Sequence, residues 1–388
     1  MQPFSLEMPR RILFGAGALS RLPELAAGLG RRVLLCTGSG WFARSPWNRR
    51  VRELLAGFEV SALPLPPGEP ESGALDGLLA QAREARPDLI AAVGGGSVLD
   101  SAKALSALLP LSGKVEDYLE GVGEGRPIPG PGVPWLALPT TAGTGAEATK
   151  NAVVRAGALG FKRSLRSSHL LAACVVVDPE LSRDCPLPLT GFTGMDALTQ
   201  LIESYVSRKA TPVTRALARE AFPVMLRALK RLPERPDDLE ARGAAAYGAL
   251  ASGISLANAG LGAAHGFASG LGGMYEVPHG LICALFIRPV LRFNAPAIRE
   301  DCGRLARSAA ELAGRAPAAP LPADPVEWLL EEIEGLFRLY GLPENLKSFS
   351  IRPADIPEIA RRSSGSSMSG NPVEVPQSVR ERMLAELL

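Results

Sequence analysis

The first half of the chain alternates short apolar runs with segments of helical pattern. Apolar runs that predict buried strands lie at 33–37, 58–63, 89–93, 135–138 and 174–177, and helical patterns lie at 48–56, 74–85 and 98–109. Strands that alternate with helices are typical of a mostly parallel sheet with helices on both faces. The pattern therefore predicts an α/β domain in this half.

The second half has a helical pattern throughout. From Gly194 onward Ala, Leu, Arg and Glu recur at helical spacing, and helices are expected at 195–207, 212–230, 239–259 and 325–340. A Pro-rich stretch at 184–190 separates the halves, and 388 residues suffice for two domains. We expect an α/β domain over 1–188, an all-α domain over 189–388, and a Ser- and Gly-rich loop at 362–372.

Composition narrows the class of protein. Forty-two basic and 40 acidic residues leave a net charge of +2, which gives no basis for a nucleic-acid or membrane-surface partner. The five cysteines form no C-x-x-C pair, so we expect buried, reduced thiols. The first 13 residues are broken by prolines and charges, and the apolar run 170–177 is too short to span a bilayer. These features predict a cytoplasmic protein.

Two glycine-rich loops carry the signal for a nucleotide. The segment DLIAAVGGGSVLDSAK (88–103) runs from a strand through Gly94, Gly95 and Gly96 into a helix, where exposed amides favour a diphosphate. Ser97 can cap that helix or donate to a phosphate. An ordinary tight turn is the alternative, and the spacing is not G-x-G-x-x-G.

The second such loop is LPTTAGTGAEAT (138–149). Its hydroxyls, on Thr140, Thr141 and Thr144, can hold ribose, phosphate or the nicotinamide amide. A threonine-capped helix start is the alternative for this loop.

Two of the three histidines, His265 and His279, lie close together in the sequence and suggest a metal site. His265 is on a helical segment and His279 follows a turn, so both rings can reach one point. Upstream, Asp196 and Gln200 are four residues apart and share a helix face. Asp196, His265 and His279 form a three-ligand set that leaves a fourth position open. The alternative is a helix-capping Asp and two structural histidines.

These motifs occur in one order over nearly the whole chain, together with FGAGAL (14–19), VVDPEL (176–181), GMDALT (194–199), NAGLGAAHG (258–266), VPHG (277–280) and Asn371-Pro372. In this they resemble the iron-containing (group III) alcohol dehydrogenase family, which belongs to the dehydroquinate synthase-like superfamily. The resemblance implies hydride transfer between NAD or NADP and a small alcohol or aldehyde, and a homodimer or larger oligomer. It also implies a metal site in the cleft between a nucleotide-binding α/β domain and a helical domain.

The resemblance also assigns residues to these roles. The diphosphate would lie on Gly94, Gly95, Gly96 and Ser97, and the rest of the cofactor against Asp100, Thr140, Thr141, Thr144 and Lys162. The metal would be held by Asp196, Gln200, His265 and His279. Asp100 and Ser269 are the candidate catalytic groups.

The chain departs from the family pattern at two positions. Gln200 and Ser269 stand where the family usually has histidine. An amide oxygen is a weaker ligand than imidazole for iron. We therefore expect zinc or another divalent metal on the other three ligands, as in the related zinc-dependent glycerol dehydrogenases, with Gln200 beside it or weakly bound. A proton relay would need water, Ser269 or the cofactor ribose.

The end of the first predicted strand bears on cofactor choice. Many relatives have an aspartate there that binds the adenosine ribose, whereas this chain has Gly38 followed by Ser39. A 2′-phosphate would then meet no carboxylate, so we expect NADP to be accepted. Two other functions remain possible from the sequence: a dehydroquinate-synthase-like lyase, and a nucleotide-binding protein without turnover.

Overall fold

The computed structural model describes the chain except for residues 1–2, 122, 157–159 and 315–321. It divides into two compact units, Glu7–Cys185 and Pro186–Leu388, the second including the N-terminal segment up to Leu6. The expected boundary at residue 188 falls in the first turn of α6 (Leu187–Val206). Each unit is described by itself.

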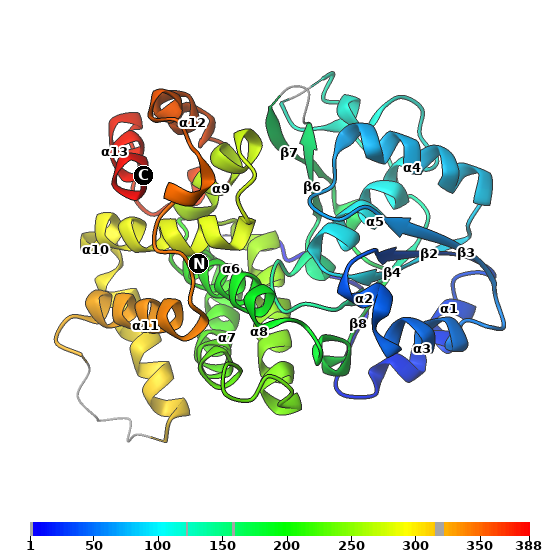
Figure 1. The fold of residues 1–388 in the computed structure, drawn as a ribbon, viewed down its shortest axis with the longest axis horizontal. Coiled ribbons are helices and arrows are strands. Elements are labelled where there is room, and N and C mark those ends of the chain that lie inside the picture. Colours follow the sequence, from blue (N-terminus) through cyan, green and yellow to red (C-terminus); the bar gives the residue numbers. More distant parts are fainter. Residues whose placement is uncertain (1–2, 122, 157–159, 315–321) are drawn as a thin grey trace. The chain divides into compact units, whose positions relative to one another are not determined.

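The first unit is built on a six-stranded parallel sheet (Figure 1), ordered β1-β8-β5-β4-β2-β3. Its strands are β1 (Ile12–Phe14), β2 (Arg32–Gly38), β3 (Glu59–Leu65), β4 (Leu89–Gly94), β5 (Trp135–Pro139) and β8 (Cys174–Val177). All the strands expected from apolar runs are present, and the α/β class is confirmed. Among the strands of this sheet, only the short edge strand β1 was not predicted.

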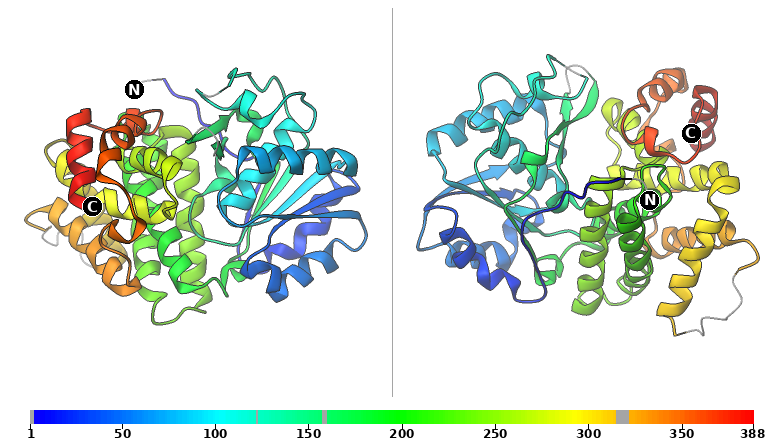
Figure 2. Two further views of the ribbon diagram at one scale, coloured as in Figure 1. Left: turned by 45° about the horizontal axis from the view of Figure 1, so that its top comes forward. Right: turned by 180° about the vertical axis from the view of Figure 1, so that it is seen from behind.

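Helices cover both faces of this sheet (Figure 2). One face carries α1 (Leu22–Ala27), α2 (Trp41–Arg44) and α3 (Pro46–Leu54), and the other carries α4 (Ser72–Ala85) and α5 (Gly96–Leu108). Along β2, Val33 and Leu35 pack in the cluster that contains α1 and α3, while Leu34 and Cys36 are buried on the opposite face. This burial on both sides explains the continuous apolar runs in the sequence.

A separate antiparallel hairpin was not predicted. It pairs β6 (Asn151–Ala156) with β7 (Phe161–Arg166). Both strands of the hairpin contact the rest of the unit. The Arg155 amide of β6 donates to the Pro70 oxygen at 2.7 Å, and the Ser164 oxygen of β7 accepts from the Glu120 amide at 3.0 Å. Strand β7 was not predicted because its sequence is rich in charged residues. Only two of its six residues are buried.

The second unit is helical, as expected. It contains α6 (Leu187–Val206), α7 (Pro212–Arg231), α8 (Leu239–Ala259), α9 (Ala263–Met274), α10 (His279–Leu312), α11 (Pro325–Tyr340), α12 (Ile356–Arg362) and α13 (Gln377–Leu387). Helices α6, α7 and α8 pack on one another, and α10 packs against α6, α9 and α11. The expected loop at 362–372 includes a single 3-10 turn, Met368–Gly370.

Within the described residues, α10 is the helix long and apolar enough to cross a membrane by length and composition. However, 61% of its apolar stretch is buried inside the protein, and a core helix meets the same criteria. The five cysteines are all buried, as expected.

Candidate functional site

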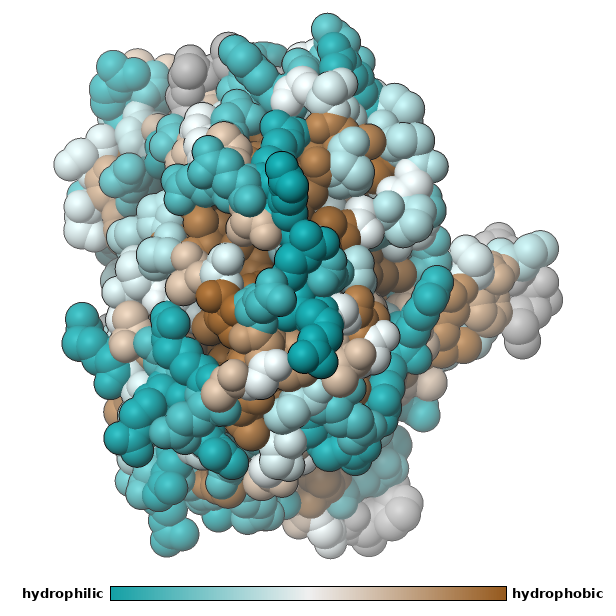
Figure 3. Space-filling model, turned by 90° about the vertical axis from the view of Figure 1, so that its right-hand side faces the viewer, coloured by the Kyte–Doolittle hydropathy of each residue, from teal (hydrophilic) through white to brown (hydrophobic). Residues whose placement is uncertain are grey.

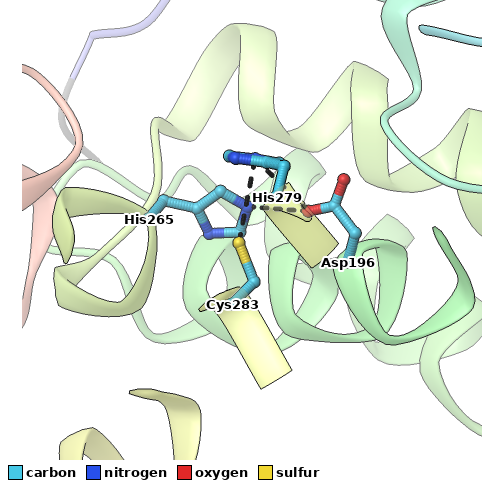
Figure 4. Close-up of side chains that lie close together, drawn as sticks. All are labelled: Asp196, His265, His279 and Cys283. Carbon is cyan, nitrogen blue, oxygen red and sulfur yellow. Dashed lines mark hydrogen bonds and ion pairs between the residues drawn. The ribbon is translucent and has the colours of Figure 1, made fainter. Parts of the chain in front are cut away.

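Four side chains from three helices of the second unit point toward one another (Figure 4). They are Asp196 on α6, His265 on α9, and His279 and Cys283 on α10, and their donor atoms all lie within 4.8 Å of one another. Asp196 Oδ1 is 3.1 Å from His265 Nε2 and 3.8 Å from His279 Nε2. The structure thus brings together the three residues expected to bind metal, and it adds a cysteine.

A close helix contact explains how His279 reaches Asp196. Helix α10 begins at His279, and the next residue is Gly280. A methyl group on Gly280 would lie 2.0 Å from the Phe192 backbone oxygen and 3.4 Å from the Asp196 Cβ. Only glycine permits this approach of α10 to α6.

Glu203 orients the His265 ring. Its carboxylate lies 2.7 Å from His265 Nδ1 and accepts from the amides of Gly262 and Ala264 at 3.0 and 2.7 Å. With Nδ1 engaged, Nε2 faces the cluster, which is the usual carboxylate–histidine arrangement around a metal. Glu203 was not predicted from the sequence. Its position seven residues after Asp196 on the same helix face was the available signal.

Gln200 lies beside the cluster. Its side-chain oxygen accepts from Ser252 Oγ at 2.8 Å, and its nitrogen donates to Asp196 Oδ1 at 3.4 Å. Ser269 is half-buried on α9, one turn after His265. Metal binding by Gln200 and a catalytic role for Ser269 stay predictions.

The cluster favours a cation. Asp196 and Glu203 are buried carboxylates, each 2% exposed, and buried carboxylates need positive partners. Burial alone would lower the pKa of His265, but Cys283, Asp196 and Glu203 raise that pKa well above its usual value. Burial raises the pKa of Cys283 to about 11. Both groups thus favour their protonated forms, and a metal would compete with those protons.

The donor spacing fits a divalent ion. Bonds of about 2.0–2.3 Å from a tetrahedral metal place neighbouring donors roughly 3.3–3.8 Å apart. The two Asp196–histidine distances, 3.1 and 3.8 Å, are close to that spacing. The residues present therefore suit a metal ion.

In the first unit, the two glycine-rich loops meet at the carboxyl edge of the sheet. Gly94 ends β4 opposite Pro139 of β5, and the Thr140 amide donates to the Gly94 oxygen at 3.0 Å. A methyl group on Gly96 would lie 2.6 Å from Thr144 Oγ1. Strand β2 lies next to β4 in the sheet and runs parallel to it. Gly38, the last residue of β2, therefore lies at the same edge.

Other side chains also lie close to the backbone at the neighbouring Gly94 and Gly95. A methyl group on Gly94 would lie 2.5 Å from the Val98 side chain, and one on Gly95 would lie 3.2 Å from Thr141 Oγ1. Gly95 to Ser97 are half-buried at the start of α5, where helix amides favour an anion.

Asp100 and Lys162 make contacts within this unit. Asp100 accepts from the Val153 amide at 3.0 Å and forms an ion pair of 3.0 Å with the buried Lys103. Lys162, on β7, forms an ion pair with Glu69. These contacts tie the hairpin to α5 and to the loop after β3. Direct contact of Asp100 with the cofactor or substrate stays a prediction, as does that of Lys162.

The chain combines a parallel α/β unit, which carries two glycine-rich loops, with a helical unit, which carries a cluster of residues that could hold a metal ion. The sequence-family model of iron-containing alcohol dehydrogenases matches residues 9–179. A second family model, of the C-terminal part of Fe-containing alcohol dehydrogenases, matches residues 190–387. The chain therefore belongs to the iron-containing alcohol dehydrogenase family.

Individual relatives agree with this assignment. The chain is 32% identical to 1,3-propanediol dehydrogenase of Klebsiella pneumoniae over 99% of this chain and 97% of that one. It is 29% identical to NAD-dependent methanol dehydrogenase of Bacillus methanolicus over 91% of each. The crystal structure of a 1,3-propanediol oxidoreductase superposes over 100% of both chains with a TM-score of 0.88 and 28% identity.

These relatives are named as dehydrogenases or as an oxidoreductase, so the comparisons favour the alcohol dehydrogenase function over the lyase alternative. The protein is an NAD-linked alcohol dehydrogenase of a family that uses a divalent metal.

Proposed function

We propose that the protein interconverts a small primary alcohol and its aldehyde, with a divalent ion held by Asp196, His265 and His279. The observation that carries this proposal is the convergence of these three donors, from three helices, within the buried cluster. The names of its relatives, which include propanediol and methanol dehydrogenases, support a small alcohol as substrate. We assign nucleotide binding to residues 1–188 and metal binding to residues 189–388.

When bound, the metal would polarise the substrate oxygen and the nicotinamide would exchange the hydride. The chain's own residues position these groups. Glu203 holds His265 with Nε2 toward the cluster. Gly94 to Ser97 offer backbone amides to the diphosphate at the start of α5. The hydroxyls of Thr140, Thr141 and Thr144 are the proposed donors to the remainder of the cofactor. Asp100 and Lys162 are proposed to bind the cofactor as well.

A proton must also move between the substrate oxygen and solvent. We propose that the Ser269 hydroxyl takes part in this relay, because Ser269 lies one turn from His265 on α9. A hydroxyl both donates and accepts, so it can pass a proton to water without holding a charge.

Acceptance of NADP is part of the proposal. Gly38 ends β2, and Ser39 follows it on the surface. This arrangement offers a hydroxyl rather than a carboxylate to the 2′-phosphate. The ratio of kcat/KM for NADPH to kcat/KM for NADH measures how well NADP is accepted. A ratio far below one would contradict the proposed acceptance of NADP.

We also propose a homodimer or larger assembly located in the cytoplasm. Figure 3 shows apolar areas between hydrophilic ones on the face formed by the α/β unit. Two residues of the sheet's edge strands, Phe14 of β1 and Val60 of β3, are 45% and 37% exposed. Exposed edge strands are places where chains pair. Light scattering measures the assembly. The burial of all five cysteines supports a reducing compartment.

Nicotinamide absorbance across a panel of small alcohols and aldehydes tests the reaction. Protein stripped with a chelator should be inactive and should regain turnover with zinc, and Asp196→Asn should stay inactive under the same conditions. Cofactor binding without turnover on any substrate, with zinc, iron, manganese or nickel, would support the non-enzymatic alternative instead.

A further inference from the structure

Cys283 lies in the donor cluster but has no part in the proposed function. It follows His279 by one turn of α10, so both side chains emerge on the same helix face. Its Sγ is 3.8 Å from His279 Nε2 and within 4.8 Å of the donor atoms of Asp196 and His265. Figure 4 shows the sulfur pointing into the group formed by the other three side chains.

Gln200 is the other neighbour that could complete the donor set, but its geometry is less suitable. The only metal-binding atom of an amide side chain is its oxygen, and in Gln200 that atom accepts a hydrogen bond from Ser252. The Gln200 nitrogen, which cannot bind a metal, faces Asp196. The sulfur of Cys283 therefore stands among the donors, while the oxygen of Gln200 is turned toward α8.

We propose that Cys283 Sγ is the fourth protein ligand of the metal, in an Asp196–His265–His279–Cys283 set. The inference rests on the proposed function, since it assumes that the three other residues bind a divalent ion. On binding, the S–H bond of Cys283 breaks, a sulfur–metal bond forms, and the proton passes to water or buffer without any change of oxidation state.

A thiolate ligand changes which metal the site selects. Soft sulfur donors favour zinc over magnesium, calcium and manganese, which prefer oxygen. Four-coordinate zinc can expand to five-coordination during reaction, so four protein ligands are compatible with catalysis. The site is then a zinc site of mixed oxygen, nitrogen and sulfur character.

Cobalt(II) provides a direct test because a thiolate bound to cobalt gives a sulfur-to-metal charge-transfer band in the near ultraviolet. Chelator-stripped full-length protein is titrated with cobalt(II) under anaerobic conditions. The wild type should develop the band up to one equivalent. Cys283→Ser should lose the band, keep visible cobalt absorption, and bind cobalt at least about tenfold more weakly. Cys302→Ser, a matched control at a buried cysteine further along α10, should keep the band.

Cobalt bound at one equivalent without a charge-transfer band, or a band that survives in Cys283→Ser, would overturn the inference and leave the metal-dependent function standing. Failure of the wild type to bind cobalt or zinc at all would overturn both. If Cys283→Ser does not fold, X-ray absorption on zinc-loaded wild type decides the question. One sulfur neighbour at about 2.3 Å supports the inference, and only nitrogen and oxygen neighbours contradict it.

Discussion

The carboxylate of Glu203 lies 2.7 Å from His265 Nδ1 while it also accepts hydrogen bonds from the backbone amides at the start of α9. A single side chain on α6 therefore fixes both the position of α9 and the rotation of the ring that α9 carries. Asp196, two turns earlier on α6, meets the opposite nitrogen of that ring. One face of α6 thus organises the cluster of donor side chains.

Glu203→Gln should weaken metal binding more than it weakens the fold. The amide keeps one acceptor oxygen for the α9 backbone, but it loses the charge that makes His265 a stronger donor. Removal of such a partner typically costs 10- to 100-fold in metal affinity. Competition with a chromophoric chelator measures this change, and thermal unfolding of the metal-free protein measures stability. Glu300→Gln, at an exposed position on α10, is the control. Equal metal affinity in the variant and the wild type would refute the orienting role.

Gly280→Ala should disturb the cluster through the backbone. The added methyl group would lie 2.0 Å from the Phe192 oxygen, so α10 must move away from α6 and carry His279 with it. We expect a loss of unfolding free energy of about 1–3 kcal/mol from overpacking, together with weaker zinc binding. Denaturant unfolding and zinc competition measure the two effects. Gly335→Ala on α11, where the nearest neighbour is the end of Arg338 at 3.9 Å, should leave zinc affinity unchanged.

The sequence predicts the parts of this site that depend on short-range pattern, but not those that depend on packing. The strands of the parallel sheet were found because burial on both faces makes them continuously apolar. Asp196, His265 and His279 were predicted as metal ligands because they lie in the short sequence motifs GMDALT, NAGLGAAHG and VPHG. Glu203 and Cys283 were not predicted, because nothing in the sequence indicates which residues they contact. Those contacts form only when α6, α9 and α10 pack together.

The same limit applies to secondary structure. The β6–β7 hairpin was missed because β7, with the sequence FKRSLR, has no apolar alternation strong enough to predict a strand. Helix α10 was not predicted at all. Pro289 and Pro296 lie inside it, and internal prolines usually indicate a helix boundary.

Gly96→Ala should impair cofactor binding while it leaves the metal cluster intact. The new methyl group would lie 2.6 Å from Thr144 Oγ1, which forces the two glycine-rich loops apart at the start of α5. We expect affinity for NADH and NADPH to fall at least about tenfold, equivalent to roughly 1.4 kcal/mol. Reduced-cofactor fluorescence measures the affinity. Gly77→Ala on α4, with open space around its Cα, is the control, and an equal loss there would contradict the prediction.

Gly38→Asp should shift cofactor preference from NADPH toward NADH. A carboxylate at the end of β2 would accept the ribose hydroxyls of NADH and repel the 2′-phosphate of NADPH. The nearest atom to the new Cβ is Val98 Cγ2 at 3.3 Å, so a shift of a few tenths of an ångström accommodates it. We expect the kcat/KM ratio of NADPH to NADH to fall at least about tenfold. Equal losses with both cofactors would mean that Gly38 does not contact this part of the nucleotide.

Glu147 should make stability depend on pH near neutrality. It is 3% exposed in the second glycine-rich loop, and burial raises its pKa from 4.5 to about 7. The folded protein therefore keeps this proton up to about pH 7, whereas the unfolded chain loses it near pH 4.5. The stability is fully present below the unfolded pKa and is lost as pH rises toward the folded one.

Glu147→Gln tests this assignment because glutamine mimics the protonated acid at every pH. The unfolding free energy of the wild type minus that of the variant should fall between pH 5 and pH 8, by on the order of 1–3 kcal/mol. Urea unfolding at several pH values measures this difference, in which the titration of other groups cancels. Glu84→Gln, on the exposed side of α4, controls for the loss of one negative charge. Parallel pH profiles for the wild type and Glu147→Gln would show that Glu147 is already ionised at pH 5 in the folded protein.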